Sequence, residues 1–277
     1  ASLTTEQAAA LTSGQLNALS STQVTALETS AIAALGTAQV SALASQQVSV
    51  LTTAQIAAIE TQDVAVMNVG QVRALNTAQV QALDTAQVVA LTTQQVAALT
   101  STQVGVISSA QAAALETQDV AALNTTSLRS LSTDAVAALA TEQIASLTTA
   151  QAASLTTLQV SSLDTAQVAA ISTAAVAALT TAGIRALDDT GAAALTTAQS
   201  AALTTNQLQA LYTQQVAALG TSNIAGLSSA QISKLTSAQV GALTTEQVVV
   251  VTVPNLQGTS IEDFGYQLGR HWGIGTK

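Results

Sequence analysis

The chain has 277 residues, of which 48% are apolar, 8% charged and 1% aromatic, whereas about 25% of the residues in an average soluble domain are charged. The absence of Cys excludes a disulfide scaffold and a cysteine nucleophile, and the single His, His271, excludes a zinc site built from several histidines of one chain. A net charge of −9 argues against nucleic acid as a partner. Thr, Ser or Gln interrupts every apolar stretch, so we expect no membrane span. We identify no candidate catalytic, cofactor-binding or metal-binding residue.

An eight-residue repeat occupies the chain from Leu3 onward. Leu recurs at this spacing up to Leu243, with Ile or Met in a few copies, which gives 31 octads without an insertion or deletion. Numbered from this Leu, position three is Thr or Ser in 29 of the 31 octads, and position five is Gln in 22 of 31. Position six is mostly Val, Ile or Leu. Such regularity predicts an architecture of stacked, equivalent units.

The octad period argues against a continuous helix. Eight residues at about 100° each place successive Leu residues about 80° apart, so they would face no common partner. A coiled coil requires a period of about 7 or 11 residues. A strand would place positions one and six on opposite faces, and Ala and Gln are weak strand formers. A β-solenoid, one bent helix and a disordered chain remain the alternatives to short stacked helices.

Each octad carries the signals that begin a helix. Position two draws mainly on Thr, Ser, Asp and Asn, which favour the N-cap, and Gln three residues later completes a capping box. Leu before the cap and Val at the fourth helical position match a hydrophobic staple. The structural residues of this pattern are exemplified by Leu147, Thr148 and Gln151 and, two octads later, by Leu163, Asp164, Gln167 and Val168.

The spacing of the caps limits the length of each helix. The next cap follows one octad later, so a helix has only about six residues and cannot be stable alone. It must be held by contacts with neighbouring octads, as in a solenoid. We therefore predict an all-α solenoid of very short helices, one per octad, over residues 1–246.

A longer period accompanies the octads. Arg73, Arg129 and Arg185 recur at a spacing of seven octads. One explanation is duplication of a seven-octad block. The other is a superhelix with seven octads per turn, which would align these charges. We favour duplication, and both explanations can hold together.

Two acidic pairs share the seven-octad spacing, Glu60 with Asp63 and Glu116 with Asp119. Carboxylates are calcium ligands, but each pair alone offers fewer oxygens than the six to eight that calcium takes. We therefore expect both pairs to lie on a solvated face rather than to bind calcium.

The composition changes after Thr245. Residues 247–253 are β-branched apart from Gln247 and precede Pro254, the only proline, which predicts a buried strand. A turn follows over residues 255–258, and Ser260 then caps a helix with an apolar face. This order predicts the strand–turn–helix opening of an α/β unit. Because the strand has no partner elsewhere in the chain, we expect further sequence or a second chain to supply one.

The tail V-V-V-V-T-V-P-N-L-Q-G-T-S-I-E-D-F-G-Y-Q-L-G-R-H-W-G-I-G-T-K resembles the opening of the TPM domain. The resemblance covers residues 247–277 and lies in V-P-x-L-x-G, I-E-D-F and W-G-I-G-x-K. It implies an extracytoplasmic α/β/α domain, with phosphatase activity in some members and interaction roles in others. Octads replace the family's helix before the first strand, and the part after W-G-I-G-x-K is missing. The residues expected to bind metal or act chemically lie in that missing part, so none is carried over.

Two functions are compatible with these features. We favour a non-catalytic structural or interaction repeat protein, a bacterial, extracytoplasmic rod, stalk or adhesin-like scaffold with a protein or cell-surface partner and no cofactor. The alternative is a repeat-bearing TPM-domain protein whose metal-dependent phosphatase activity resides in a part missing from this chain. The apolar ends of an uncapped array also predict end-to-end self-association.

Overall fold

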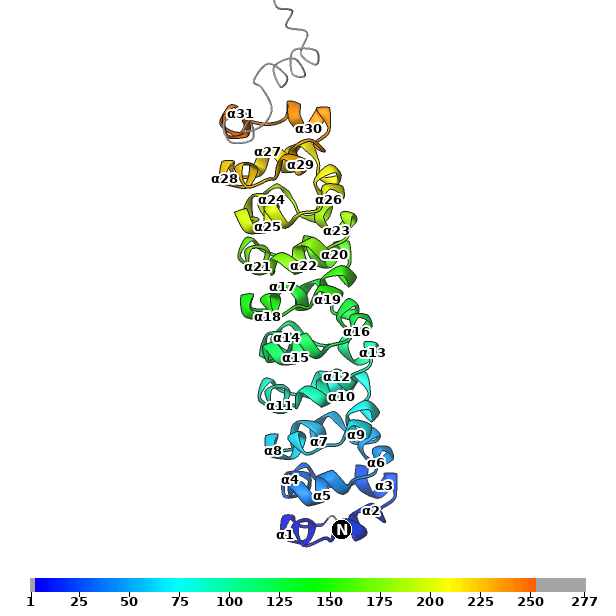
Figure 1. Ribbon diagram of the computed structural model, residues 1–277. Helices are drawn as coiled ribbons and strands as arrows, with labels where there is room; N and C mark the ends of the chain where they lie inside the picture. The colour runs from blue at the N-terminus through cyan, green and yellow to red at the C-terminus, as the bar shows by residue number, and fades with distance from the viewer. Residues whose placement is uncertain (1–2, 253–277) are drawn as a thin grey trace, which may run out of the picture. The chain divides into compact units, whose positions relative to one another are not determined.

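The computed structural model describes residues 3–252, and this part of the chain consists of 31 short α-helices joined by turns, one for each octad (Figure 1). The same residues contain no strand. The predicted all-α solenoid of very short helices is therefore confirmed. The chain divides into two compact units, Ala1–Leu163 and Asp164–Lys277.

The first unit has helices of four to six residues. Their bounds are α1 (Thr5–Ala9), α2 (Ser13–Asn17), α3 (Ser21–Thr25), α4 (Thr29–Ala33), α5 (Thr37–Ala42), α6 (Ser45–Ser49), α7 (Thr53–Ala57), α8 (Thr61–Ala65), α9 (Val69–Ala74), α10 (Thr77–Ala82), α11 (Thr85–Ala90), α12 (Thr93–Ala98), α13 (Ser101–Val104), α14 (Ser109–Ala114), α15 (Thr117–Ala122), α16 (Thr125–Ser130), α17 (Thr133–Ala137), α18 (Thr141–Ala145), α19 (Thr149–Ser154) and α20 (Thr157–Ser161).

The second unit continues the same pattern over its described residues, 164–252. Its helices are α21 (Thr165–Ala170), α22 (Thr173–Ala178), α23 (Thr181–Ala186), α24 (Asp189–Ala194), α25 (Thr197–Ala202), α26 (Thr205–Ala210), α27 (Thr213–Ala218), α28 (Thr221–Ala225), α29 (Ser229–Ile232), α30 (Ser237–Gly241) and α31 (Thr245–Thr252). Among the helices between residues 3 and 252, we find none with the length and apolarity that crossing a membrane requires.

Each helix begins at position three of its octad. In α19, Thr148 is extended, with φ −70° and ψ 160°, and Thr149 is the first helical residue. The helix ends at Ser154, and Leu155, which opens the next octad, returns to φ −55° and ψ 137°. Because extended backbone recurs at the octad boundaries before α31, each of the helices α1 to α30 ends before it has completed two turns.

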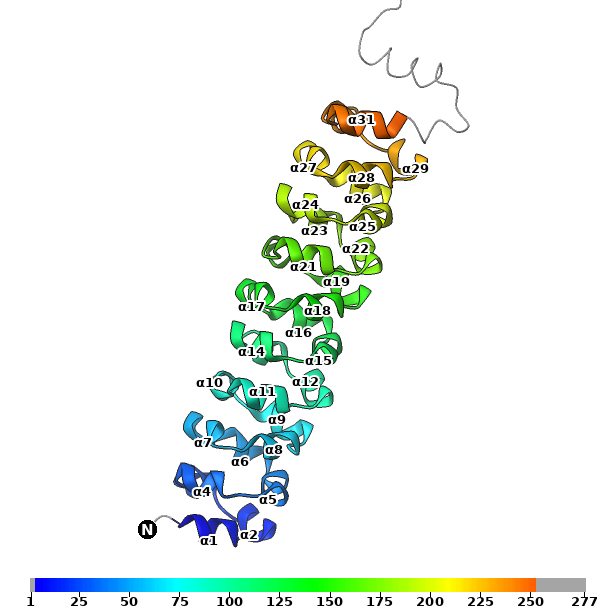
Figure 2. The same ribbon diagram turned by 90° about the vertical axis from the view of Figure 1, so that its left-hand side faces the viewer.

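Helices three places apart along the chain pack against each other within both units. In the first unit α13 packs against α16, and in the second α28 packs against α31. Figure 2 shows the resulting layers of helices from the side, within each unit. This packing supplies the stability that helices of such length lack on their own.

Positions one and six form the apolar core. Val96 and Leu99 are both buried, as are the equivalent residues of most other octads. Inside the first unit, residues such as Val80 and Leu91 leave a cavity of only about 20 Å³, which is close to the space that one water molecule needs. This part of the interior is therefore filled by side chains and has no room for a ligand.

One turn of the solenoid spans between three and four octads. Buried Gln side chains bond to carbonyl groups 28 and 31 residues earlier, as from Gln79 to Leu51 and to Val48. The interpretation of one superhelical turn per seven octads is therefore wrong, because seven octads make two turns at the 28-residue spacing of these bonds. Arg73 and Arg129 accordingly lie two turns apart in the first unit. Duplication of a seven-octad block stays a prediction.

The predicted strand is wrong over residues 247–252, because Thr245–Thr252 forms helix α31. Gln247 keeps the octad register. Its Oε1 accepts a hydrogen bond from the Thr244 N–H at 2.8 Å, and its Nε2 donates to the Leu219 carbonyl at 2.5 Å. These tertiary bonds outweigh the β-propensity of the Val run, since such propensity depends strongly on context.

Candidate functional site

Thr148 and Gln151 hold the start of α19 together by reciprocal hydrogen bonds. The Gln151 N–H donates to Thr148 Oγ1 at 3.2 Å, and the Thr148 N–H donates to Gln151 Oε1 at 2.9 Å. Leu147, which precedes the cap, is buried. The two polar side chains thus satisfy backbone N–H groups that the start of a helix leaves without an intrahelical partner.

Asp164 and Gln167 repeat this arrangement at the start of α21. The Gln167 N–H donates to Asp164 Oδ1 at 2.7 Å, and the Asp164 N–H donates to Gln167 Oε1 at 2.9 Å. Gln167 and Val168 are buried, whereas Leu163 is half-buried. The residue types differ from those at α19, but the capping geometry is the same.

The Gln side chain also joins one turn of the solenoid to the preceding one. Gln151 Nε2 donates to the carbonyl oxygens of Val120 at 2.7 Å and Leu123 at 2.8 Å. Gln151 is only 2% exposed. We call the position-five Gln residues that bond across turns in this way the glutamine ladder. They include Gln39, Gln47, Gln55, Gln71, Gln79, Gln87, Gln95, Gln103, Gln111, Gln143, Gln151 and Gln159 in the first unit and Gln199, Gln207, Gln215, Gln231, Gln239 and Gln247 in the second.

Capping explains only the Oε1 contact of each ladder residue. The cross-turn bonds of the Nε2 groups were not predicted from the sequence. A signal for them was nevertheless present. A capping box accepts Glu as well as Gln, yet Glu occurs at position five in none of the 31 octads. Glu offers the same acceptor but lacks the amide N–H donors. The exclusion of Glu therefore indicates that the side chain must donate as well as accept.

Asp63 and Asp119 occupy position five, where the ladder has Gln. Both are 1% exposed, so the expected solvated face is wrong for these residues, although Glu60 and Glu116 are exposed. Both carboxyl oxygens of Asp119, and Oδ1 of Asp63, are buried without a hydrogen-bond partner. An ionised carboxyl group cannot donate to the carbonyl groups of the preceding turn. Within residues 3–252, no group of three or more His, Cys, Asp or Glu side chains is placed to hold a metal ion.

Burial raises the pKa of both carboxyl groups. For Asp119, desolvation by burial is the largest cause and raises the pKa. The nearby Thr93 hydroxyl and Glu116 backbone lower the pKa, and the negative charge of Glu116 raises it. For Asp63, desolvation again comes first and the Glu60 charge second, and both raise the pKa. The neutral acid, which has an O–H donor, therefore fits position five better than the carboxylate does.

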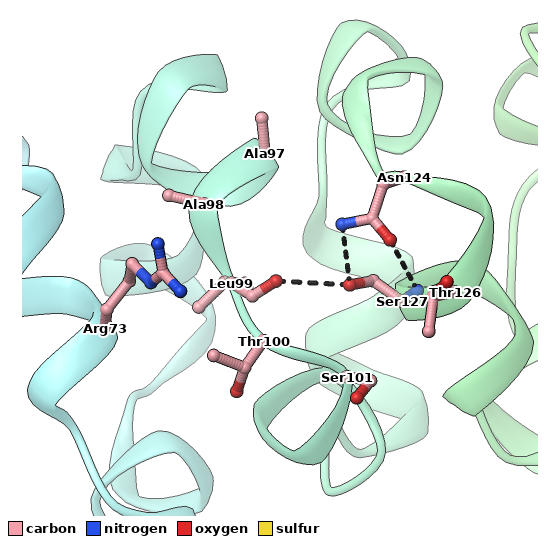
Figure 3. A pocket seen from close by; sticks show the side chains of 9 residues that line it. All are labelled: Arg73, Ala97, Ala98, Leu99, Thr100, Ser101, Asn124, Thr126 and Ser127. Carbon is pink, nitrogen blue, oxygen red and sulfur yellow. Dashed lines mark hydrogen bonds between the residues drawn. The ribbon is translucent and has the colours of Figure 1, made fainter.

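A hollow of about 330 Å³ lies beside Arg73 in the first unit (Figure 3). Here Ser127 occupies position five. Its Oγ donates to the Leu99 carbonyl at 3.1 Å and accepts from Asn124 Nδ2 at 3.0 Å. The hollow has no acidic side chain in its lining, which consists of Arg73, Ala97, Ala98, Leu99, Thr100, Ser101, Asn124, Thr126 and Ser127. It is the candidate binding site of the first unit.

Arg185, in the second unit, already has a partner within the chain. Its Nη2 donates to Tyr212 Oη at 2.5 Å, and its guanidinium carbon lies 4.4 Å from the centre of the Tyr212 ring. This is a cation–π contact combined with a hydrogen bond. Tyr212 lies 27 residues after Arg185, and the residue at the same spacing after Arg73 is Thr100, which lines the hollow.

A comparison with models of known protein families identifies the repeat. The model of the ALTTAQ repeat matches residues 24–58, 56–93, 112–149 and 168–205, which together cover just over half of the chain. The chain belongs to the ALTTAQ repeat family. No curated protein and no solved structure matches it.

The ALTTAQ matches follow the longer period of the sequence. Three of them begin at residues 56, 112 and 168, each seven octads after the one before. A single match, such as the one over residues 112–149, is slightly longer than the 31-residue reach of a ladder Gln. One ALTTAQ match therefore includes a ladder Gln together with the carbonyl groups to which it donates.

The C-terminal part of the ALTTAQ chain matches a second family. The model of the TPM domain matches residues 221–277. The resemblance found at residues 247–277 is thereby confirmed, and the match begins earlier, within the octads that form α28 to α31. Val253, the predicted turn at 255–258, the helix predicted to start at Ser260, and His271 lie outside the described residues.

Proposed function

We propose that the ALTTAQ array is a non-catalytic structural or interaction scaffold, which acts outside the cytoplasm of a bacterium as a rod, stalk or adhesin-like spacer for a protein or cell-surface partner. The glutamine ladder is the observation that carries this proposal. It ties each turn to the preceding one through buried, uncharged hydrogen bonds that recur along both units. An array built in this way is suited to hold other groups at a fixed distance.

We further propose that residues 1–246 form this scaffold and residues 247–277 a TPM-like segment. The extracytoplasmic assignment rests on the TPM match, since TPM domains are commonly extracytoplasmic. The absence of Cys is compatible with that location because no thiol is available for oxidation.

Block deletions test the spacer. Removing residues 56–111 takes out seven complete octads within the first unit, so the residues on either side of the deletion keep the octad register. We expect this variant to fold cooperatively and to have a shorter maximum dimension in small-angle X-ray scattering. Removing residues 56–83 takes out three and a half octads, which breaks the register of the repeat, and we expect it to fold poorly. Equal folding of both variants, or an unchanged dimension after the longer deletion, would contradict the proposal.

The TPM match supports a second candidate, a repeat-bearing protein with metal-dependent phosphatase activity. The full chain can be assayed for hydrolysis of a chromogenic phosphomonoester with added Mg²⁺ or Ca²⁺. Metal-dependent turnover would favour this second candidate. No turnover under the same conditions would favour the scaffold.

A further inference from the structure

We propose that the hollow beside Arg73 is a binding site for a small oxyanion, a phosphate or a carboxylate group. The inference goes beyond the scaffold proposal and does not depend on it, because the site would serve an enzyme-bearing chain equally well. It rests on the origin of the hollow, on its unused donors, and on a comparison with Arg185.

The hollow arises where the ladder is interrupted. In the preceding turn Gln103 fills the equivalent space, and its Nε2 donates to Val72 and Leu75, both at 2.8 Å. Ser127 is too short to do the same, and its Oγ reaches only the Leu99 carbonyl at 3.1 Å. Space remains where a Gln amide would lie. The volume of about 330 Å³ is at the lower end of the range for ligand sites, which fits a small ligand.

The hollow offers donors and no opposing charge. Arg73 is exposed, and its guanidinium makes no hydrogen bond or ion pair within residues 3–252. The hydroxyl groups of Ser101 and Thr126 also make no hydrogen bond there. Figure 3 shows Arg73 on one side of the Leu99–Thr100–Ser101 segment and Asn124 with Ser127 on the other. The planar, forked guanidinium matches the geometry of phosphate and carboxylate groups.

Arg185 shows what happens where the chain itself supplies a partner. The Tyr212 ring covers its guanidinium at 4.4 Å, and the Tyr212 hydroxyl takes one of its donors. At the same spacing after Arg73 the chain has Thr100, whose small side chain cannot cover the guanidinium in this way. Arg73 thus keeps its donors available for a ligand from outside the chain.

The test is an NMR titration of the full chain, uniformly labelled with ¹⁵N, with inorganic phosphate and separately with acetate at constant ionic strength. We expect a saturable shift of the Arg73 Nε–Hε resonance. Arg185 is the matched control because it is also exposed but its guanidinium already bonds to the Tyr212 hydroxyl and stacks on the Tyr212 ring. Equal, unsaturable shifts of both resonances would show only general screening of charge and would overturn the proposal. Saturation by phosphate at the lower concentration identifies a phosphate site, and saturation by acetate at the lower concentration a carboxylate site.

Two variants complete the test. Ser127→Gln restores the ladder residue and occupies the part of the hollow next to the Leu99 carbonyl, and we expect it to weaken binding by at least about tenfold. Arg73→Gln removes the charge at an exposed position, and we expect saturable shifts to disappear from the backbone amide of Thr126. Unchanged affinity in either variant, with circular dichroism showing an intact fold, would overturn the proposal.

Discussion

Replacing Gln95 by Ala tests the energetic role of the glutamine ladder. Gln95 is 2% exposed. Its Oε1 accepts from the Thr92 N–H at 2.6 Å, and its Nε2 donates to the carbonyl groups of Val64 at 2.9 Å and Met67 at 2.7 Å. Each such bond contributes about 0.5–1.5 kcal/mol, and a buried group left without its partner adds to the loss. We expect the free energy of unfolding of the first unit to fall by about 3 kcal/mol.

Gln94 provides the matched control for this substitution. It is the adjacent residue of the same helix, α12, and its side chain is exposed. Gln94→Ala removes the same atoms and changes helix propensity by the same amount, so we expect a change within about 0.5 kcal/mol. Urea denaturation gives the free energies, and hydrogen exchange at the Thr92 amide reports local opening. Equal losses of stability in the two variants would refute a role for the cross-turn bonds.

Three further predictions concern buried polar groups and the ends of the array. Asp119→Gln restores a donor at position five, and we expect it to stabilise the first unit at neutral pH by about 1–3 kcal/mol in urea denaturation. Because burial raises the folded pKa of Asp119 above its ordinary value of 3.8, the stabilisation by its acid form is complete below pH 3.8 and is lost as the pH rises through the raised pKa. The difference between wild type and variant therefore shrinks on acidification, and a constant difference would contradict the raised pKa. Ser200 is buried with an unpartnered hydroxyl, so we expect Ser200→Ala to raise the free energy of unfolding by about 1 kcal/mol; a lower Tm would show that the hydroxyl is needed. End-to-end association predicts an apparent mass in light scattering that grows with protein concentration, whereas a constant monomer mass would exclude it.

The local structure of this protein could be predicted from its sequence because the signals for each helix lie within one octad. The bonds between Thr148 and Gln151 span three residues, and the cap at position two sets where the helix begins. The cross-turn bonds of Gln151 reach 28 and 31 residues back. No local pattern states that distance, so neither the turn size nor the burial of Asp63 and Asp119 could be predicted.

The error at residues 247–252 has the same origin. A run of Val favours a strand when its surroundings are unknown. In the fold, the Gln247 side chain donates a hydrogen bond to the Leu219 carbonyl one turn earlier, and this contact stabilises the helix over the strand. The hollow beside Arg73 was missed for a related reason, because Ser127 and Thr100 become neighbours of Arg73 only through the stacking of turns.

The glutamine ladder has a consequence for the conditions that the protein tolerates. Its bonds join neutral amide groups to carbonyl groups in places that water and ions do not reach. Dissolved salt weakens attraction between exposed charges but has little effect on such buried, uncharged contacts. The cohesion between turns is therefore insensitive to ionic strength, and we expect each unit to keep its fold in dilute and in concentrated saline alike.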